Sequence, residues 1–293
     1  MGRSVKNIVC RLVPLLLMAG TGMGFVRAQA VESMLLVKPG DEDATPKRAG
    51  DFVGELTRYL AGHTVGVAQL AGHITNQTDS AAAWIRARQP TLYFVPPSFF
   101  LKFLDNTGGE VVAEVPRFGV AEPHYYLVAL CTTPMGLEAI RGGLISAADG
   151  FDEDYLRRVV LPADFQPGSD FTLMPSENLA DDIYLMMEGG APEESPPVAV
   201  LLDEELKQFF ESDSLVWPSL HVVWTSPPVP RDLVVVSANQ WTDASIDGLR
   251  QVLQSMKDDR EGAKLLDLMH TTGFIEPNES LIDVARQKYR SGQ

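Results

Sequence analysis

The chain has 293 residues, 45% of them hydrophobic, and its 39 acidic residues outnumber 24 basic ones to give a net charge of −15. A surface this acidic repels nucleic acid and anionic lipid, so we expect neither as a partner. The length suits one large domain or two lobes. Of the two cysteines, Cys10 lies in a leading segment that we expect to be removed, and Cys131 alone cannot form an internal disulfide, so stability must come from a packed core.

The first 30 residues have the order of a cleavable secretory signal peptide. A leading region with three basic residues precedes an apolar run of about 14 residues, too short for a hydrocarbon core of about 30 Å. Ala-Gln-Ala at 28–30 predicts cleavage after Ala30, with an uncleaved membrane anchor as the alternative. The segment contains four basic residues and no acidic ones, so its removal takes the net charge from −15 to −19. We expect a periplasmic or secreted monomer with no later membrane span.

Short apolar runs alternate with helical spacings through the first half of the mature chain. We expect strands over 33–38, 63–69, 91–95, 111–115 and 125–131. We expect helices over 49–60, 79–87 and 98–104, and another that begins at Pro134.

The second half repeats this alternation and then becomes helical. We expect strands over 144–148, 171–174, 198–202, 221–225 and 233–237. Helices are expected over 152–160 and 178–188, after the 198–202 strand through Phe210, and in a C-terminal tail around 246–256, 265–269 and 281–289.

Helices that separate strands indicate βαβ units, and hence an α/β fold with largely parallel sheets. Two such blocks joined by extended crossings predict two lobes. The expected limits are 31–127 plus 228–293 for lobe 1 and 128–227 for lobe 2, after a signal peptide at 1–30. Such lobes direct their strand-end loops toward a shared cleft, and the crossings act as a hinge.

The order of several segments, and the residues within them, resemble those of a known protein family. The segments are Thr91–Phe100, Tyr125–Cys131, Val198–Asp203, Trp224–Pro230, Gly248–Leu253, Gly262–Leu266 and Thr272–Phe274. Together they are similar to the phosphonate/phosphite-type solute-binding proteins of ABC transporters, a branch of the type 2 periplasmic binding fold. The resemblance implies capture of a small ligand by hinge closure, delivery to an ABC permease and no enzymatic activity.

The resemblance also implies a site for an anion, from which this chain departs. The family holds phosphonate oxygens on a serine- and threonine-rich turn at the first helix of the second lobe. The corresponding segment here, Ser146–Gly150, contains two alanines and Asp149. A carboxylate at that position repels a phosphonate, whereas it could pair with a cationic group of a ligand.

Polar and aromatic residues at strand ends are the candidates for binding a ligand. They are Ser98, Phe99, Tyr125, Thr132, Thr133, Asp149 and Asp203. Ser98 and Asp203 have an alternative role as helix N-caps, and Asp149 as a turn residue. Only one of Tyr125 and Tyr126 can face the cleft, because neighbouring strand residues point to opposite faces.

Catalytic and metal-binding patterns are absent from the sequence. It contains neither a nucleophile elbow nor a zinc-protease or phosphate-loop motif, and its five histidines are scattered. Cys131 lies in an apolar run, which favours a buried, inert thiol. We therefore expect no cofactor and no metal, and interpret the chain as an exported solute-binding protein. The alternative is a sensory or scaffolding descendant of the same fold whose ligand site is altered or lost, with an exported enzyme as a third class.

Overall fold

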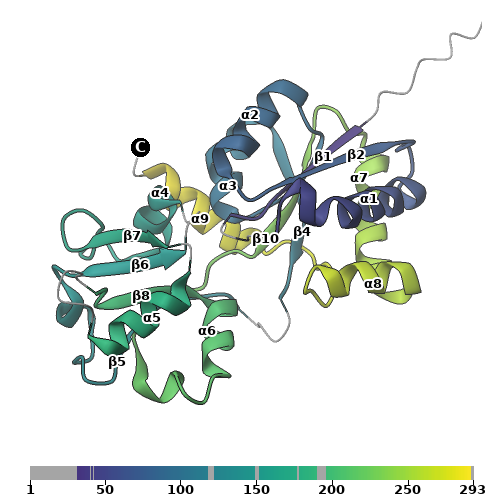
Figure 1. Ribbon diagram of the computed structural model, residues 1–293. Helices are drawn as coiled ribbons and strands as arrows, with labels where there is room; N and C mark the ends of the chain where they lie inside the picture. The colour runs from purple at the N-terminus through teal and green to yellow at the C-terminus, as the bar shows by residue number, and fades with distance from the viewer. Residues whose placement is uncertain are drawn as a thin grey trace, which may run out of the picture. The chain divides into compact units, whose positions relative to one another are not determined.

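The computed structural model describes residues 32–39, 41, 43–117, 122–148, 152–176, 178–189 and 196–291 (Figure 1). The predicted signal peptide and Asp149 lie outside these described residues. Val31–Gln293 form one compact unit, which contains two five-stranded sheets.

The first sheet has the strand order β2-β1-β3-β10-β4. Its strands are β1 (Glu32–Val37), β2 (Leu70–Thr75), β3 (Leu92–Val95), β4 (Gly109–Val115) and β10 (Asp232–Ser237). β1 pairs in parallel with β2 and β3, whereas β10 runs antiparallel between β3 and β4. The late strand β10 therefore completes a sheet that the first third of the chain begins.

Helices cover both faces of this sheet because alternate residues of its strands are apolar on opposite sides. Along β1, Met34 and Leu36 join one buried cluster, and Leu35 and Val37 join another. Figure 1 shows α1, α7 and α8 on one side of the sheet and α2 and α3 on the other. The elements are α1 (Pro46–His63), α2 (Thr78–Arg88), α3 (Pro97–Phe99), η1 (Phe100–Leu104), η2 (Asp105–Thr107), α7 (Asp243–Ser255), η6 (Met256–Asp258) and α8 (Arg260–Leu268).

The second sheet has the order β7-β6-β8-β5-β9 and the same mixed character. β6 is parallel to β7 and β8, whereas β5 runs antiparallel between β8 and β9. The strands are β5 (Tyr125–Leu130), β6 (Leu144–Ala148), β7 (Thr172–Ser176), β8 (Ala199–Asp203) and β9 (Leu220–Thr225). The helices are η3 (Leu137–Ile140), α4 (Glu153–Tyr155), η4 (Leu156–Val160), α5 (Leu179–Glu188), α6 (Glu204–Glu211) and η5 (Trp217–Ser219).

The chain passes between the sheets twice, once between β4 and β5 and once between β9 and β10. The two crossings are held together where the Tyr125 amide donates to Ser226 Oγ at 2.9 Å and the Val229 amide donates to the Pro123 carbonyl at 3.0 Å. The α/β fold with two lobes and hinge crossings is confirmed. Four of the five strands in each sheet run in the same direction, as expected of largely parallel sheets, whereas the strand that follows each crossing, β5 or β10, runs antiparallel to its neighbours.

The last helix, α9 (Glu279–Ser291), packs on η4. Its buried residues Ile282, Ala285 and Tyr289 share a cluster with Leu156 and Val159. The helical C-terminal tail thus extends from the helices of the first sheet to a helix that follows strand β6 of the second. The exact limits of the two lobes, 31–127 plus 228–293 and 128–227, stay a prediction.

Three local expectations differ from the structure. The strand predicted over 63–69 is replaced by the end of α1 and a turn through Gly66, whose φ of +84° favours glycine, and β2 begins only at Leu70. The helix expected to begin at Pro134 does not form there. Cys131 is exposed and lies beyond the end of β5, with its Sγ 3.1 Å from the Leu220 carbonyl, so its predicted burial is wrong.

None of the helices in the described part of the chain is both long enough and apolar enough to cross a membrane.

Candidate functional site

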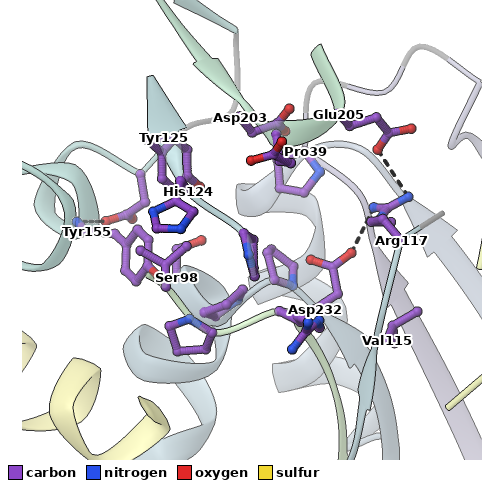
Figure 2. Close-up of a pocket in the computed structure, with 18 of the residues that line it drawn as sticks. Pro39, Ser98, Val115, Arg117, His124, Tyr125, Tyr155, Asp203, Glu205 and Asp232 are labelled. Atoms are coloured by element: carbon purple, nitrogen blue, oxygen red, sulfur yellow. Dashed lines mark hydrogen bonds and ion pairs between the residues drawn. The ribbon is translucent and has the colours of Figure 1, made fainter. Parts of the chain in front are cut away.

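A pocket with a cavity volume of about 170 Å³ is lined by residues from both sheets and both crossings (Figure 2). Loops that follow β1, β3 and β8 supply part of its wall, and the starts of β5 and β10 supply another part. Ligands of α/β sheets bind at such a place, outside the carboxyl ends of parallel strands where the strand order switches. The pocket is therefore the candidate site.

Four charged side chains form a connected group on one side of the pocket. Asp232, at the start of β10, accepts from Arg117 at 2.9 Å and from Lys38 at 3.3 Å. Arg117 also pairs with Glu205 of α6 at 3.3 Å. Burial acts to raise the pKa of the Asp232 carboxyl, but Lys38 and Arg117 outweigh it and hold that pKa below its ordinary value. Two cations are thus balanced by two carboxylates of the chain itself.

Asp203 adds a further negative charge beside this group, and the nearby Arg117 opposes the effect of burial on it without forming an ion pair. It ends β8 and is the N-cap of α6, where its Oδ1 accepts from the Leu206 amide at 2.8 Å. Burial raises the pKa of its carboxyl, and this effect prevails over the opposing hydrogen bond from Leu206. No ion pair to Asp203 occurs among the residues that the structure describes.

The helix ends at the pocket already hold carboxylates. Asp152 caps α4 by accepting from the Tyr155 amide at 2.8 Å, and it also pairs with Lys102 at 2.6 Å. Asp203 occupies the same position on α6. Because the positive end of a helix dipole is where proteins bind anions, these aspartates occupy positions that an anionic ligand needs.

Neutral polar groups line another part of the pocket. Figure 2 shows Ser98, His124 and Tyr155 together in this view, away from Arg117 and Glu205. His124 Nδ1 is 2.7 Å from the Ser226 carbonyl, so this nitrogen carries the ring hydrogen in the neutral form and Nε2 is left as an acceptor. These groups can exchange hydrogen bonds with an uncharged part of a ligand.

Three of the seven expected binding residues, Ser98, Tyr125 and Asp203, line this pocket together. Phe99 points instead into the core, where it is 2% exposed and its ring centroid is 4.7 Å from that of Phe103.

Thr132 and Thr133 follow the far end of β5 and are not part of the lining. Asp149 lies outside the described residues. Ser146, which begins the segment expected to replace the family's anion turn, is buried and donates to Asp182 of α5. Whether any of the seven binds a ligand stays a prediction.

Sequence reasoning missed Lys38, Arg117, Tyr155, Glu205 and Asp232. A signal for two of them was present, because Arg117 and Asp232 flank the crossings that were expected to form the hinge. Tyr155 gave no such signal, since its position within an apolar helical pattern is equally typical of core packing.

Comparisons with known proteins agree on the kind of fold. A family model described as "ABC transporter, phosphonate, periplasmic substrate-binding protein" matches residues 43–281. A comparison with curated proteins finds no match.

Solved structures with a similar fold include XAC2383 from Xanthomonas citri, which has 15% identity and a TM-score of 0.68. One structure of it is bound to chloride ion and another to ATP. The match covers 89% of this chain in both cases, and 99% of the chloride-bound chain and 98% of the ATP-bound chain. A binding protein component of an ABC phosphonate transporter from Pseudomonas aeruginosa has 14% identity and a TM-score of 0.61, covering 90% of this chain and 89% of that one. PhnD1 from Prochlorococcus marinus, in complex with methylphosphonate, also has 14% identity and a TM-score of 0.61, covering 89% and 97%. At these identities the similarity shows a shared fold and nothing about the ligand.

Proposed function

We propose that this chain, which belongs to the family of periplasmic substrate-binding proteins of phosphonate ABC transporters, binds a small solute carrying a positively charged ammonium group. The family consists of solute-binding proteins and not of enzymes. The observation that carries the proposal is the charge of the pocket. Five acidic side chains line it against three basic ones, and the acidic ones are Asp152, Asp203, Glu204, Glu205 and Asp232.

The basic side chains of the pocket already have partners within the chain. Lys38 and Arg117 pair with Asp232, and Arg231 lies 3.4 Å from the buried Glu114. An anionic ligand would have to compete with these carboxylates and lie close to Asp203 as well. An ammonium group instead compensates the carboxylate of Asp203, whose pKa stays raised by burial although Arg117 lies near enough to oppose that effect.

The volume of the pocket limits the size of the ligand. A cavity of about 150 Å³ is known to accommodate benzene, so a cavity of about 170 Å³ suits a compound of similar size. Ethanolamine and choline are in this range. Methylphosphonate, the ligand in the Prochlorococcus structure, also fits by size, so charge and not volume separates the two classes. ATP, present in one Xanthomonas structure, is much larger than this cavity.

We further propose that the protein is cleaved after Ala30 and delivers its ligand to an ABC permease. The sequence at 28–30 supports the cleavage site, and the periplasmic family supports the delivery. A sensory or scaffolding role is the second candidate. It is favoured by one observation, that Asp152 and Asp203 occupy the helix ends at which an anion would otherwise bind.

Calorimetry and thermal shift of the mature protein with choline, ethanolamine, 2-aminoethylphosphonate, methylphosphonate and phosphate test the proposal. We expect binding of the ammonium compounds and none of phosphate or methylphosphonate. The variant Asp203→Asn keeps an N-capping oxygen but loses the charge, and should weaken ammonium binding at least tenfold. The matched control Asp259→Asn changes a capping aspartate of α8 outside the pocket and should leave the affinity unchanged.

The pH dependence supplies a second readout. Because the pKa of Asp203 is raised, its charge and with it the ammonium affinity should be lost on acidification before an ordinary aspartate would titrate. Binding of methylphosphonate without any ammonium compound would contradict the proposal. Silence of the whole panel would favour the sensory or scaffolding role.

A further inference from the structure

Tyr155 brings a buried hydroxyl to the pocket. Its side chain is 2% exposed, and it lines the cavity in which Ser98, His124 and Asp203 also lie. Among the residues that the structure describes, nothing forms a hydrogen bond with its hydroxyl oxygen. A hydroxyl buried without a partner is destabilising, so such a group in the lining of a pocket points to a partner from outside the chain.

The position of this side chain is determined by its surroundings. The Tyr155 amide donates to the capping Asp152 at 2.8 Å, which orients the first turn of α4. The ring belongs to the core cluster and the next residue, Leu156, is 1% exposed. Because backbone and ring are both held, the Tyr155 side chain keeps its place in the lining of the pocket and cannot turn outward to find water.

The hydroxyl is available there as a hydrogen-bond donor. Burial raises the pKa of Tyr155, and the charge of Asp232 raises it further, so the group keeps its proton throughout the physiological range. The proton is therefore available to an acceptor atom of the ligand. The charged groups Asp203 and Glu205 lie in another part of the same view of the pocket (Figure 2).

We propose that Tyr155 is a specificity-determining residue that donates a hydrogen bond to an uncharged oxygen of the ligand. The substrate class is then a small ammonium compound that also carries a hydroxyl, ether or carbonyl oxygen. This inference rests on the proposed function for the charged end of the ligand, and adds the chemistry of its other end. A site built to bond such an oxygen rejects the analogue that lacks it, since the tyrosine hydroxyl is then left buried and unpaired.

Two pairs of probes distinguish the proposed role of Tyr155 from the more general proposal that the pocket binds an ammonium compound. Choline and propyltrimethylammonium have the same size and charge but differ in a hydroxyl against a methyl group, as do ethanolamine and propylamine. We expect the wild-type protein to bind the oxygen-bearing member of at least one pair about tenfold more tightly, as for a single buried hydrogen bond. In Tyr155→Phe this preference should fall to about twofold or less, while the affinity for the oxygen-free member stays unchanged.

Controls keep folding effects apart from recognition. Tyr155→Phe removes an unpartnered hydroxyl, so its free energy of unfolding without ligand should equal or exceed that of the wild type. Tyr59→Phe is the matched control, because it removes a hydroxyl that donates to Asp259 outside the pocket, and it should leave the preference intact. Equal binding of both members of each pair, with no effect of Tyr155→Phe, overturns this inference and leaves the ammonium proposal standing. Failure of all four probes to bind overturns both.

Discussion

Asp232 decides, at the scale of a single residue, which sign of charge the pocket presents. Its carboxylate accepts from both Lys38 and Arg117, the two cations that line the pocket beside it. Without that carboxylate the same two side chains would form a site for an anion, of the kind at which phosphate or phosphonate binds. Asp232 therefore acts with Glu205, the second partner of Arg117, to keep these cations from an anionic ligand.

We expect Asp232→Asn to create affinity for methylphosphonate and phosphate, measurable by calorimetry, because it frees Lys38 and leaves Arg117 with Glu205 alone, while preserving the shape of the side chain. The variant should also be destabilised by about 1.5–3 kcal/mol in urea unfolding, since it weakens hydrogen bonds between charged, half-buried groups. The control is Asp170→Asn, which removes an arginine-paired aspartate of similar exposure outside the pocket. If the variant bound neither methylphosphonate nor phosphate, Lys38 and Arg117 would not be accessible to a ligand.

The contribution of the Asp232 carboxylate to the free energy of unfolding depends on pH, and the pKa shift gives the direction of that dependence. The pKa of Asp232 is lower in the folded protein than in the unfolded chain, because Lys38 and Arg117 outweigh the effect of burial. Its stabilisation is therefore fully present above the ordinary pKa of an aspartate and is lost as the pH falls through the lowered value. The difference in unfolding free energy between wild type and Asp232→Asn should accordingly shrink in strong acid.

At the scale of elements, α9 is a structural member of the fold and not a loose tail. Arg158 of η4 donates to the Tyr289 carbonyl at 3.2 Å, and its guanidinium lies 5.3 Å from the centre of the Tyr289 ring. Arg286 and Arg290 both bind Asp105 of η2. The helix thus connects η2, which precedes strand β4 of the first sheet, with η4, which follows strand β6 of the second.

We expect Tyr289→Ala to lower the free energy of unfolding by about 3–5 kcal/mol, as for other large-to-small changes at buried aromatic positions. Val284→Ala on the same helix is the control, because Val284 is 47% exposed and a change there should cost less than about 0.5 kcal/mol. Chemical unfolding of the two variants measures both. Equal costs would mean that α9 is not docked through Tyr289.

Local patterns predicted most elements because helix and strand signals act over a few residues. Thr45 followed by Pro46 starts α1, and Thr242 caps α7, as the sequence rules for helix ends require. The strand expected over 63–69 failed because its apolar residues alternate only briefly, and the amphipathic pattern of α1 continues to His63. The sequence could not predict the mixed direction of the sheets, since strand direction depends on pairing between distant segments.

At the scale of the whole molecule, ion pairs connect parts of the chain that belong to different sheets. Arg117, in the crossing after β4, pairs with Glu205 of α6, and Lys102 of η1 pairs with Asp152 at the start of α4. Such pairs are formed only while these elements stay together. They are therefore expected to favour a closed, ligand-retaining arrangement over an open one.

We expect Lys102→Met combined with Glu205→Gln to weaken binding of the tightest ammonium probe two- to tenfold, because each partly exposed pair contributes about 0–1 kcal/mol. Small-angle scattering should show that the ligand makes the wild-type protein more compact. The same ligand should reduce the size of the double variant to a smaller degree. Lys264→Met is the control, since Lys264 pairs with Glu55 between α8 and α1, away from the pocket. An unchanged affinity in the double variant would show that these pairs play no part in closure.

The sequence by itself determined the alternation of strands and helices, the two-lobed α/β fold and the resemblance to a family of binding proteins, which the family match confirms. It also placed Ser98, Tyr125 and Asp203 among the candidates, because residues at strand ends face a ligand in such folds. Only the tertiary structure decided the charge of the pocket. Lys38 and Asp232 are 194 positions apart, and no local pattern reveals that one carboxylate will balance two distant cations. Electrostatics depends on distance in space, whereas sequence patterns report only on neighbours along the chain.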